Sequence, residues 1–401
     1  MALDFLKVSS QIEAMAGQVE ARGPERAVKL DRAVRELHEA DPLALEDKRH
    51  RAKTTFLVPG ITGPLSLQVP CPSTPPDFAV LASDGSHIDV SRHAAARCFL
   101  INIGLVELRY GAAPGARLES YPRLYSDPEE MAVVDPQDRL RPQLIEGQLL
   151  GIVRGIQELQ ALADFAESLP EDMPALALVD GTLILLSFLG QTFPDYVKRQ
   201  LLQDEFLAAL TRLRILSEKR PLAVAGYISL PGSTEVVNAL RVSLCPYDPP
   251  DCDAHCRVIQ PGERPCDEVD GLRDRDVLLR HLQEGERSGV FSSQSSVVRD
   301  WYGEHEVRFF YVNLGDEIGR VEVPAWVAQN DGLLSLTHSL IVDQSRRGHG
   351  YPVALSEAHE QAVVSGRDRQ EFARLVEESL ERRQLTASTS EKDLSKRLKW
   401  L

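Results

Sequence analysis

Two apolar segments that each run into an Asp-Gly pair constrain the fold of this chain more than any other feature. They are residues 78–86, FAVLASDGS, and residues 175–184, ALALVDGTLI. Each apolar run predicts a buried strand with a carboxylate, Asp84 or Asp180, at its end. A charge beside a buried strand is costly unless a partner such as a divalent metal offsets it. Asp-Gly between apolar runs also favours a hairpin, so a plain turn is the alternative for each segment.

The periodicity of the remaining chain predicts strands that alternate with amphipathic helices. This order favours an α/β fold with a mixed sheet core flanked by helices. Residues 54–70 are strand-like but interrupted by Pro and Gly. We expect strands at 78–83, 97–110, 175–179, 222–229, 307–313 and 319–326, and helices at 4–22, 24–41, 139–168, 194–217, 333–345, 353–364 and 369–384.

Charge and composition narrow the classes of function. The 401 residues carry a net charge of −15, which argues against a protein that coats nucleic acid non-specifically. A nuclease whose basic surface is confined to a channel remains compatible with that charge. No apolar run approaches a membrane span, and the start does not resemble a signal peptide, so we expect a cytoplasmic protein without a membrane partner. The sequence contains no G-x-x-x-x-G-K-[ST] motif, so any DNA translocation requires a partner ATPase.

Several carboxylates fit the chemistry of phosphodiester hydrolysis. Two divalent ions about 4 Å apart activate the attacking water and stabilise the leaving oxygen, and such ions prefer carboxylate oxygens. Asp84 and Asp180 are the first candidates. A third is Glu158, which lies at the edge of the apolar stripe of the predicted helix at 139–168. Glu146, in the same predicted helix, is the rival to Glu158.

An ordered set of motifs resembles one known family. The motifs are DGS at 84–86, a helix Glu, DGTLI at 180–184, AGYIS at 225–229, RVEVPAW at 320–326 and GYPxxLxxAH at 350–359. In this order, over about residues 78–365, they resemble the NurA nuclease family, whose members work with the HerA helicase-translocase.

The resemblance implies a fold, a reaction and a site. It implies a ribonuclease H-like core, a homodimer that encloses a DNA channel, and a HerA-type hexameric ATPase as partner. The implied activity is that of a manganese-dependent exonuclease and single-strand endonuclease in DNA end processing, with Mg²⁺ as a possible substitute. Motif by motif, it assigns Asp84, Glu158 and Asp180 as metal ligands. It adds His359 as a ligand or proton-transfer residue, with Tyr351 close by; eight residues apart, these two would share a face of one helix.

We divide the chain into three parts. Residues 1–75 form an N-terminal helical and strand arm, 76–370 the nuclease domain, and 371–401 a C-terminal helix with a basic tail. The apolar faces of the arm serve either to dock a second copy or a partner, or to pack on the chain's own domain. The basic tail either touches DNA phosphates or is a solvated terminal helix.

Four of the six cysteines are grouped, and their role is open. Cys245, Cys252, Cys256 and Cys266 lie within a predicted Cys-rich insertion at about 245–290. Their spacing is not that of a zinc ribbon. The alternatives are a structural zinc or iron–sulfur site and free or redox-active thiols. A non-catalytic nucleic-acid-binding adaptor stabilised by such a metal is the rival function. Glu322, within RVEVPAW, is either a carboxylate behind the metal ligands or, as we favour, part of a surface ion pair.

Overall fold

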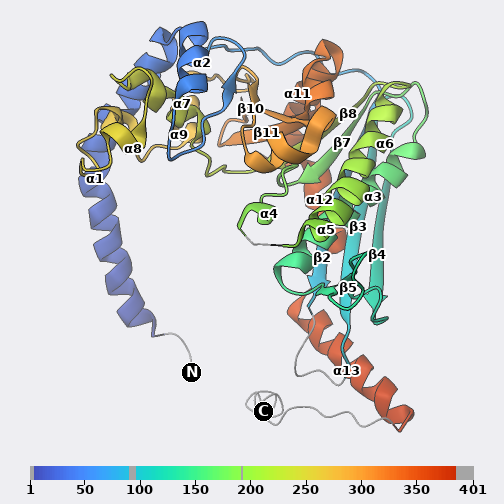
Figure 1. The fold of residues 1–401 in the computed structure, drawn as a ribbon. Coiled ribbons are helices and arrows are strands. Elements are labelled where there is room, and N and C mark those ends of the chain that lie inside the picture. The colour runs from blue at the N-terminus through green and yellow to red at the C-terminus, as the bar shows by residue number, and fades with distance from the viewer. Residues whose placement is uncertain (1–3, 90–95, 191–192, 385–401) are drawn as a thin grey trace. The chain divides into compact units, whose positions relative to one another are not determined.

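The computed structural model describes residues 4–89, 96–190 and 193–384 (Figure 1). The chain forms two compact units, which we describe separately. The first unit comprises Met1–Pro70, Ser229–Ser295 and Phe309–Arg320, and the second comprises Cys71–Ile228, Ser296–Arg308 and Val321–Leu401. Strands β10 (Val307–Asn313) and β11 (Ile318–Pro324) contribute residues to both.

The second unit is built on a mixed sheet in the order β11-β8-β7-β2-β3-β4. β2, β7 and β8 run parallel, whereas β2–β3 and β3–β4 are antiparallel, so the predicted mixed sheet is confirmed. The bounds of these strands are β2 Phe78–Ile88, β3 Phe99–Tyr110, β4 Gly115–Tyr125, β7 Ala175–Asp180 and β8 Leu222–Ile228. A separate small ladder joins β5 (Ala132–Val133) and β6 (Gln143–Leu144).

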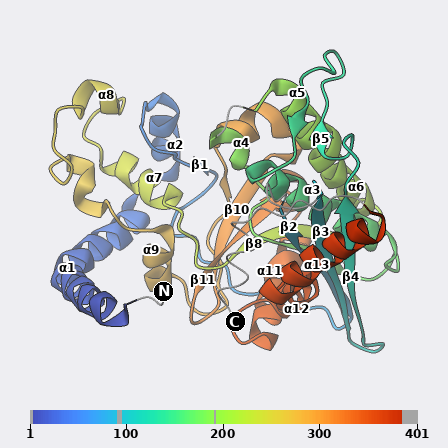
Figure 2. The same cartoon turned by 90° about the horizontal axis from the view of Figure 1, so that it is seen from below.

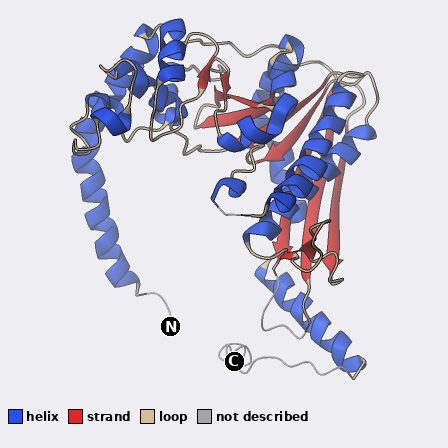
Figure 3. Cartoon of the chain, in the orientation of Figure 1, coloured by secondary structure: helices blue, strands red, loops and turns tan. Residues whose placement is uncertain are grey.

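Helices cover both faces of this sheet (Figures 2 and 3). Helix α3 (Gln148–Glu167) packs on β2 and β3 and also against α6 (Ala208–Ser217). Helix α12 (Val353–Ala362) packs on β2 and β3 from the other face, and α11 (Asp331–Arg347) packs on β7 and β8. The remaining helical segments are α4 Ser187–Gly190, α5 Asp195–Lys198, η1 Arg199–Leu207, η3 Val298–Tyr302, η4 Gly303–His305, α10 Ala325–Ala328 and α13 Gly366–Arg382.

The alternation of side chains along β2 explains why two helices share it. Successive side chains of a strand point to opposite faces. Ala79 and Leu81 belong to the apolar core that α3 completes, and Gly85 lies on the same face as these two. Asp84 points to the opposite face, beside α12, in register with Gly104 of β3.

The first unit has its own apolar core beneath short strands and helices. Leu30, Ala33 and Leu37 of α1 are buried in it at the predicted helical spacing. The elements of this unit are α1 Phe5–Glu39, α2 Pro42–Arg51, β1 Gly60–Ile61, α7 Glu235–Leu244, α8 Cys252–His255, η2 Pro265–Val269, α9 Asp274–His281 and β9 Phe291–Ser292, with parts of β10 and β11.

Three predictions of secondary structure were wrong, and one strand was missed. The two helices expected at 4–22 and 24–41 are one helix, which continues through Pro24 because this stretch is exposed and water can satisfy the carbonyl left without a donor. The helix expected from residue 139 begins at 148, after Gly147, whose φ of +57° interrupts helical geometry. Within 54–70, only residues 60–61 form a strand. The edge strand at 115–125 was missed because nearly all its side chains are exposed and carry no apolar pattern.

The compact units do not coincide with the predicted parts of the chain. The first unit joins residues 1–70 with 229–295, whereas we placed the latter inside the nuclease domain. The predicted boundaries near 75 and 370 stay predictions, and the basic tail lies outside the described residues. Within the described part of the chain, no helix has the length and apolar character needed to cross a membrane.

Candidate functional site

Asp84 and Asp180 lie in one row across neighbouring parallel strands of the second unit. Ser83 of β2 is paired with Val179 of β7, so the next residue on each strand is an aspartate on the same face. Asp84 is inside β2, which continues to Ile88, so the hairpin alternative at Asp84-Gly85 is wrong. Asp180 is the last residue of β7, as predicted.

Helix α12 brings His359 onto this row. Gly104 lies so close to the backbone of Ala358 that a side chain there would collide with it. Asn102 of β3 and Ser86 of β2 fix the end of α12, because Nδ2 of Asn102 and Oγ of Ser86 donate to the carbonyl of Ala362 at 2.9 and 2.5 Å. In this position, Nδ1 of His359 lies 2.8 Å from Oδ2 of Asp84. The imidazole itself is 58% exposed, so it remains open to a substrate.

Glu158 lies against the same stretch of β2, at Gly85, but on the opposite face of the sheet from Asp84. Its carboxylate lies against the Cα of Gly85, in space that any larger residue at position 85 would fill. Glu158 is only 4% exposed, and Nε of Arg154 lies 3.0 Å from its Oε1 in an ion pair. Burial raises the pKa of Glu158 to about 8; Arg154 opposes the rise, whereas Asp84 and Asp180 add to it.

The pKa of Asp180 is also raised, in part by the neighbouring negative charge. Asp180 as a whole residue is exposed. The protein atoms around its carboxylate nevertheless desolvate it and raise its pKa, and the negative charge of Asp84 raises this pKa further. A hydrogen bond from Tyr351 acts in the opposite direction. The ring of Tyr351 also packs edge-on against that of Tyr227, which is in register with Asp180 on β8.

The turn that follows Asp180 is held by groups that the sequence analysis did not assign to the site. Oε2 of Glu322 accepts hydrogen bonds from Oγ1 of Thr182 and from the amide of Leu183, at 2.6 and 3.0 Å. Tyr302 binds the same turn, since its hydroxyl donates to the carbonyl of Leu183. Glu322 is 2% exposed, so the favoured interpretation of it as part of a surface ion pair is wrong.

The structure places Glu146 and Tyr351 differently from the sequence-based predictions, and it adds one residue that they missed. Glu146 precedes α3 and forms an ion pair with Arg97 at 3.2 Å, in an exposed position. Tyr351 is not in one helix with His359, because α12 begins at Val353, after Pro352. Arg154 was missed; its place one helical turn before Glu158 was the available signal.

The donor set of this site suits a hard divalent cation. Three carboxylates and an imidazole offer oxygen and nitrogen ligands. As the side chains stand, no three His, Cys, Asp or Glu residues within the described ranges converge closely enough to enclose a metal ion. The arrangement is therefore an acidic site with raised carboxyl pKa values and an exposed imidazole at its edge.

Comparisons with known proteins give one informative match. The family model described as the NurA domain matches residues 78–364. A comparison with curated proteins found no match. Among solved structures, "Crystal structure of Prototype Foamy Virus Protease-Reverse Transcriptase (native)" is similar over 39% of this chain and 18% of that chain, with 15% identity and a TM-score of 0.21. That similarity is too low to support an argument about either fold or function, whereas the family match spans every residue of the acidic site.

Proposed function

Because the chain belongs to the NurA family of nuclease-associated proteins, we propose that it is a metal-dependent nuclease that hydrolyses DNA phosphodiester bonds. The observation that carries the proposal is that Asp84, Glu158 and Asp180 act electrostatically on one another, so that the pKa values of Glu158 and Asp180 are raised although Arg154 and Tyr351 contact these two carboxylates. In a purely structural cluster, cations and hydrogen-bond donors of the protein would be expected to lower the pKa values of the carboxyl groups.

The proposed cofactor is Mn²⁺, with Mg²⁺ as the alternative. Asp84, Glu158 and Asp180 would hold it, and His359 would either be a further ligand or transfer a proton. When bound, such ions lower the pKa of an attacking water and stabilise the leaving oxygen of the phosphodiester. The raised pKa of the buried Glu158 beside two further carboxylates, together with the mixed oxygen and nitrogen donor set, supports this assignment.

The chain's own residues have distinct parts in this proposal. Asp84 orients the imidazole of His359 through the 2.8 Å contact, so that its other nitrogen faces solvent and the substrate. Tyr351 holds the carboxylate of Asp180 by a hydrogen bond. Glu322 and Tyr302 fix the turn after Asp180 and thereby act as positioning residues.

The wider proposals follow from the family. We propose a ribonuclease H-like core, a cytoplasmic homodimer, and action on DNA ends together with a HerA-type hexameric ATPase. The exposed apolar side chains of α1, among them Phe5, Ile12, Met15 and Val19, support a role for the arm in docking a second copy. Light scattering on the full chain and on a chain lacking residues 1–22, which leaves the buried residues of α1 in place, tests this, and a monomeric full chain at micromolar concentration would contradict it.

Cleavage of labelled linear DNA by the purified chain tests the central proposal. We expect cleavage with Mn²⁺ and none with excess EDTA. Asp84→Ala and Asp180→Ala should each abolish cleavage, whereas Asp164→Ala, an exposed carboxylate on the same helix as Glu158, should not. Either site variant retaining more than about a tenth of wild-type activity would refute the assignment. DNA binding without cleavage would favour the adaptor function instead.

A further inference from the structure

The four grouped cysteines lie in the first unit, far along the chain from the acidic site residues. Cys245 caps the end of α7, Cys252 and Cys256 lie at the two ends of α8, and Cys266 lies in η2. The amide of Cys256 donates to the carbonyl of Cys252 at 3.0 Å, which places both cysteines on one turn. All four line one cavity, and all are free thiols.

The segment that carries them, residues 245–268, lacks an apolar interior. Its buried residues are Pro250, Cys256, Cys266 and Asp267. Val258, a large apolar residue in the segment, is 92% exposed. Small loop-rich segments without a core usually depend on a disulfide or a metal, because too little apolar surface is buried to offset the entropy of ordering them.

The cavity and its charges suit a single thiophilic ion. Its volume is about 20 Å³, which is room for one ion or water. Nη2 of Arg241 lies 3.8 Å from Sγ of Cys266, and Arg264 acts electrostatically on Cys256. Four thiolates around Zn²⁺ carry a net charge of −2, and these guanidinium groups would lower its cost, although Arg241 is also ion-paired with Asp267 and Asp270.

We propose that Cys245, Cys252, Cys256 and Cys266 bind one structural Zn²⁺ that holds residues 245–268 together. Each thiol loses its proton to solvent as its Zn–S bond forms, so one zinc replaces four protons. As noted above, no three of these side chains are yet close enough to share an ion, so binding draws the thiols inward across the cavity to Zn–S distances of about 2.3 Å. The ion has no part in the nuclease chemistry, and the inference does not depend on the proposed function.

Metal analysis of the full chain tests the proposal. The protein is produced in medium with added zinc, passed over a chelating resin and analysed by mass spectrometry for metals. We expect about one zinc per chain in the wild type and in Cys71→Ser/Cys98→Ser, the two cysteines outside the cluster. Cys252→Ser/Cys256→Ser should lose the zinc and melt at a lower temperature.

A second measurement on the wild type guards against a variant that fails to fold. Titration with a mercurial reagent should release zinc in step with modification of four of the six thiols. Folded, zinc-free wild type whose melting temperature is unchanged by zinc or chelator would overturn the proposal. Bound iron with visible absorbance would overturn the assignment to zinc.

Discussion

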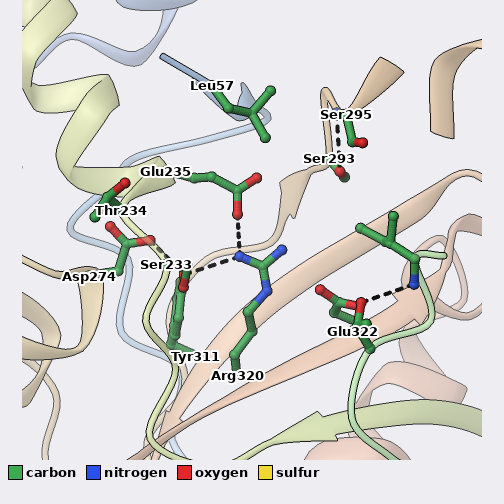
Figure 4. A network of polar contacts seen from close by, with 12 residues as sticks. Leu57, Ser233, Thr234, Glu235, Asp274, Ser293, Ser295, Tyr311, Arg320 and Glu322 are labelled. Atoms are coloured by element: carbon green, nitrogen blue, oxygen red, sulfur yellow. Dashed lines mark hydrogen bonds and ion pairs between the residues drawn. The ribbon is translucent and has the colours of Figure 1, made fainter. Parts of the chain in front are cut away.

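Two clusters of buried charge, one in each unit, differ in how their charges are balanced. In the first unit, Asp274 accepts hydrogen bonds from the amide of Val237 and the hydroxyl of Tyr311, at 2.8 and 2.6 Å. Arg320 forms an ion pair with Glu235 (Figure 4). Its guanidinium also lies over the ring of Phe309. Each carboxylate of this network is therefore paired with a donor or cation from the protein.

The acidic site of the second unit is organised in the opposite way. Glu158 is as deeply buried as the carboxylates of the first unit, but its partner Arg154 also acts electrostatically on Asp180. Its strongest neighbours besides Arg154 are two further carboxylates, which raise its pKa rather than lower it. A network completed by the protein stabilises a fold, whereas one left incomplete is suited to bind a cation from solution.

The largest expected difference between the two clusters is in the free energy of unfolding when a charged residue is removed. Arg320→Ala should lower the free energy of unfolding by about 3–5 kcal/mol, because it leaves Glu235 buried without its cation. Urea unfolding measures this, with Arg374→Ala as the control, since the ion pairs of Arg374 are exposed and contribute little. A loss no larger than that of the control would mean that the network of the first unit is not structural.

The next effect concerns catalysis at the acidic site. His359→Ala should lower the rate of DNA cleavage about 100-fold or more, because it removes the imidazole that Asp84 orients. Its neighbour Glu360 is exposed and points about 100° away around the helix, so Glu360→Ala should leave the rate nearly unchanged. Equal rates for the two variants, under conditions where both remain folded, would make His359 a structural residue.

A smaller effect is the pH dependence of stability without metal. The pKa of Glu158 is about 8 in the folded chain and about 4.5 in the unfolded chain, so between these values the folded state binds more protons. The free energy of unfolding should therefore fall as pH rises from 5 to 8, by at most about 1.4 kcal/mol per unit. Unfolding in EDTA measures the slope, which Glu158→Gln should reduce. An identical slope in the variant would show that Glu158 is not strained by its surroundings.

The sequence predicted the strands of the acidic site better than the contacts around them. The apolar runs before Asp84 and Asp180 become β2 and β7, because burial on both faces requires such runs. Placing α12 depends on Gly104, a residue distant in sequence whose missing side chain allows the helix to approach the sheet. Glu322 gives the same lesson, since only the fold shows that its carboxylate is buried beneath the turn after Asp180. Local patterns encode the strands, whereas pairing between distant segments decides which polar groups meet.

Binding of Mn²⁺ measured by calorimetry at pH 8 tests most directly that the acidic site is completed by a cation. We predict that the wild type binds Mn²⁺, and that Asp84→Asn/Asp180→Asn weakens binding at least about tenfold, which corresponds to about 1.4 kcal/mol. The control Asp164→Asn/Asp172→Asn changes two exposed carboxylates and should bind like the wild type. Wild-type protein that binds no Mn²⁺, or a site variant that binds it as tightly as the wild type, would contradict the account.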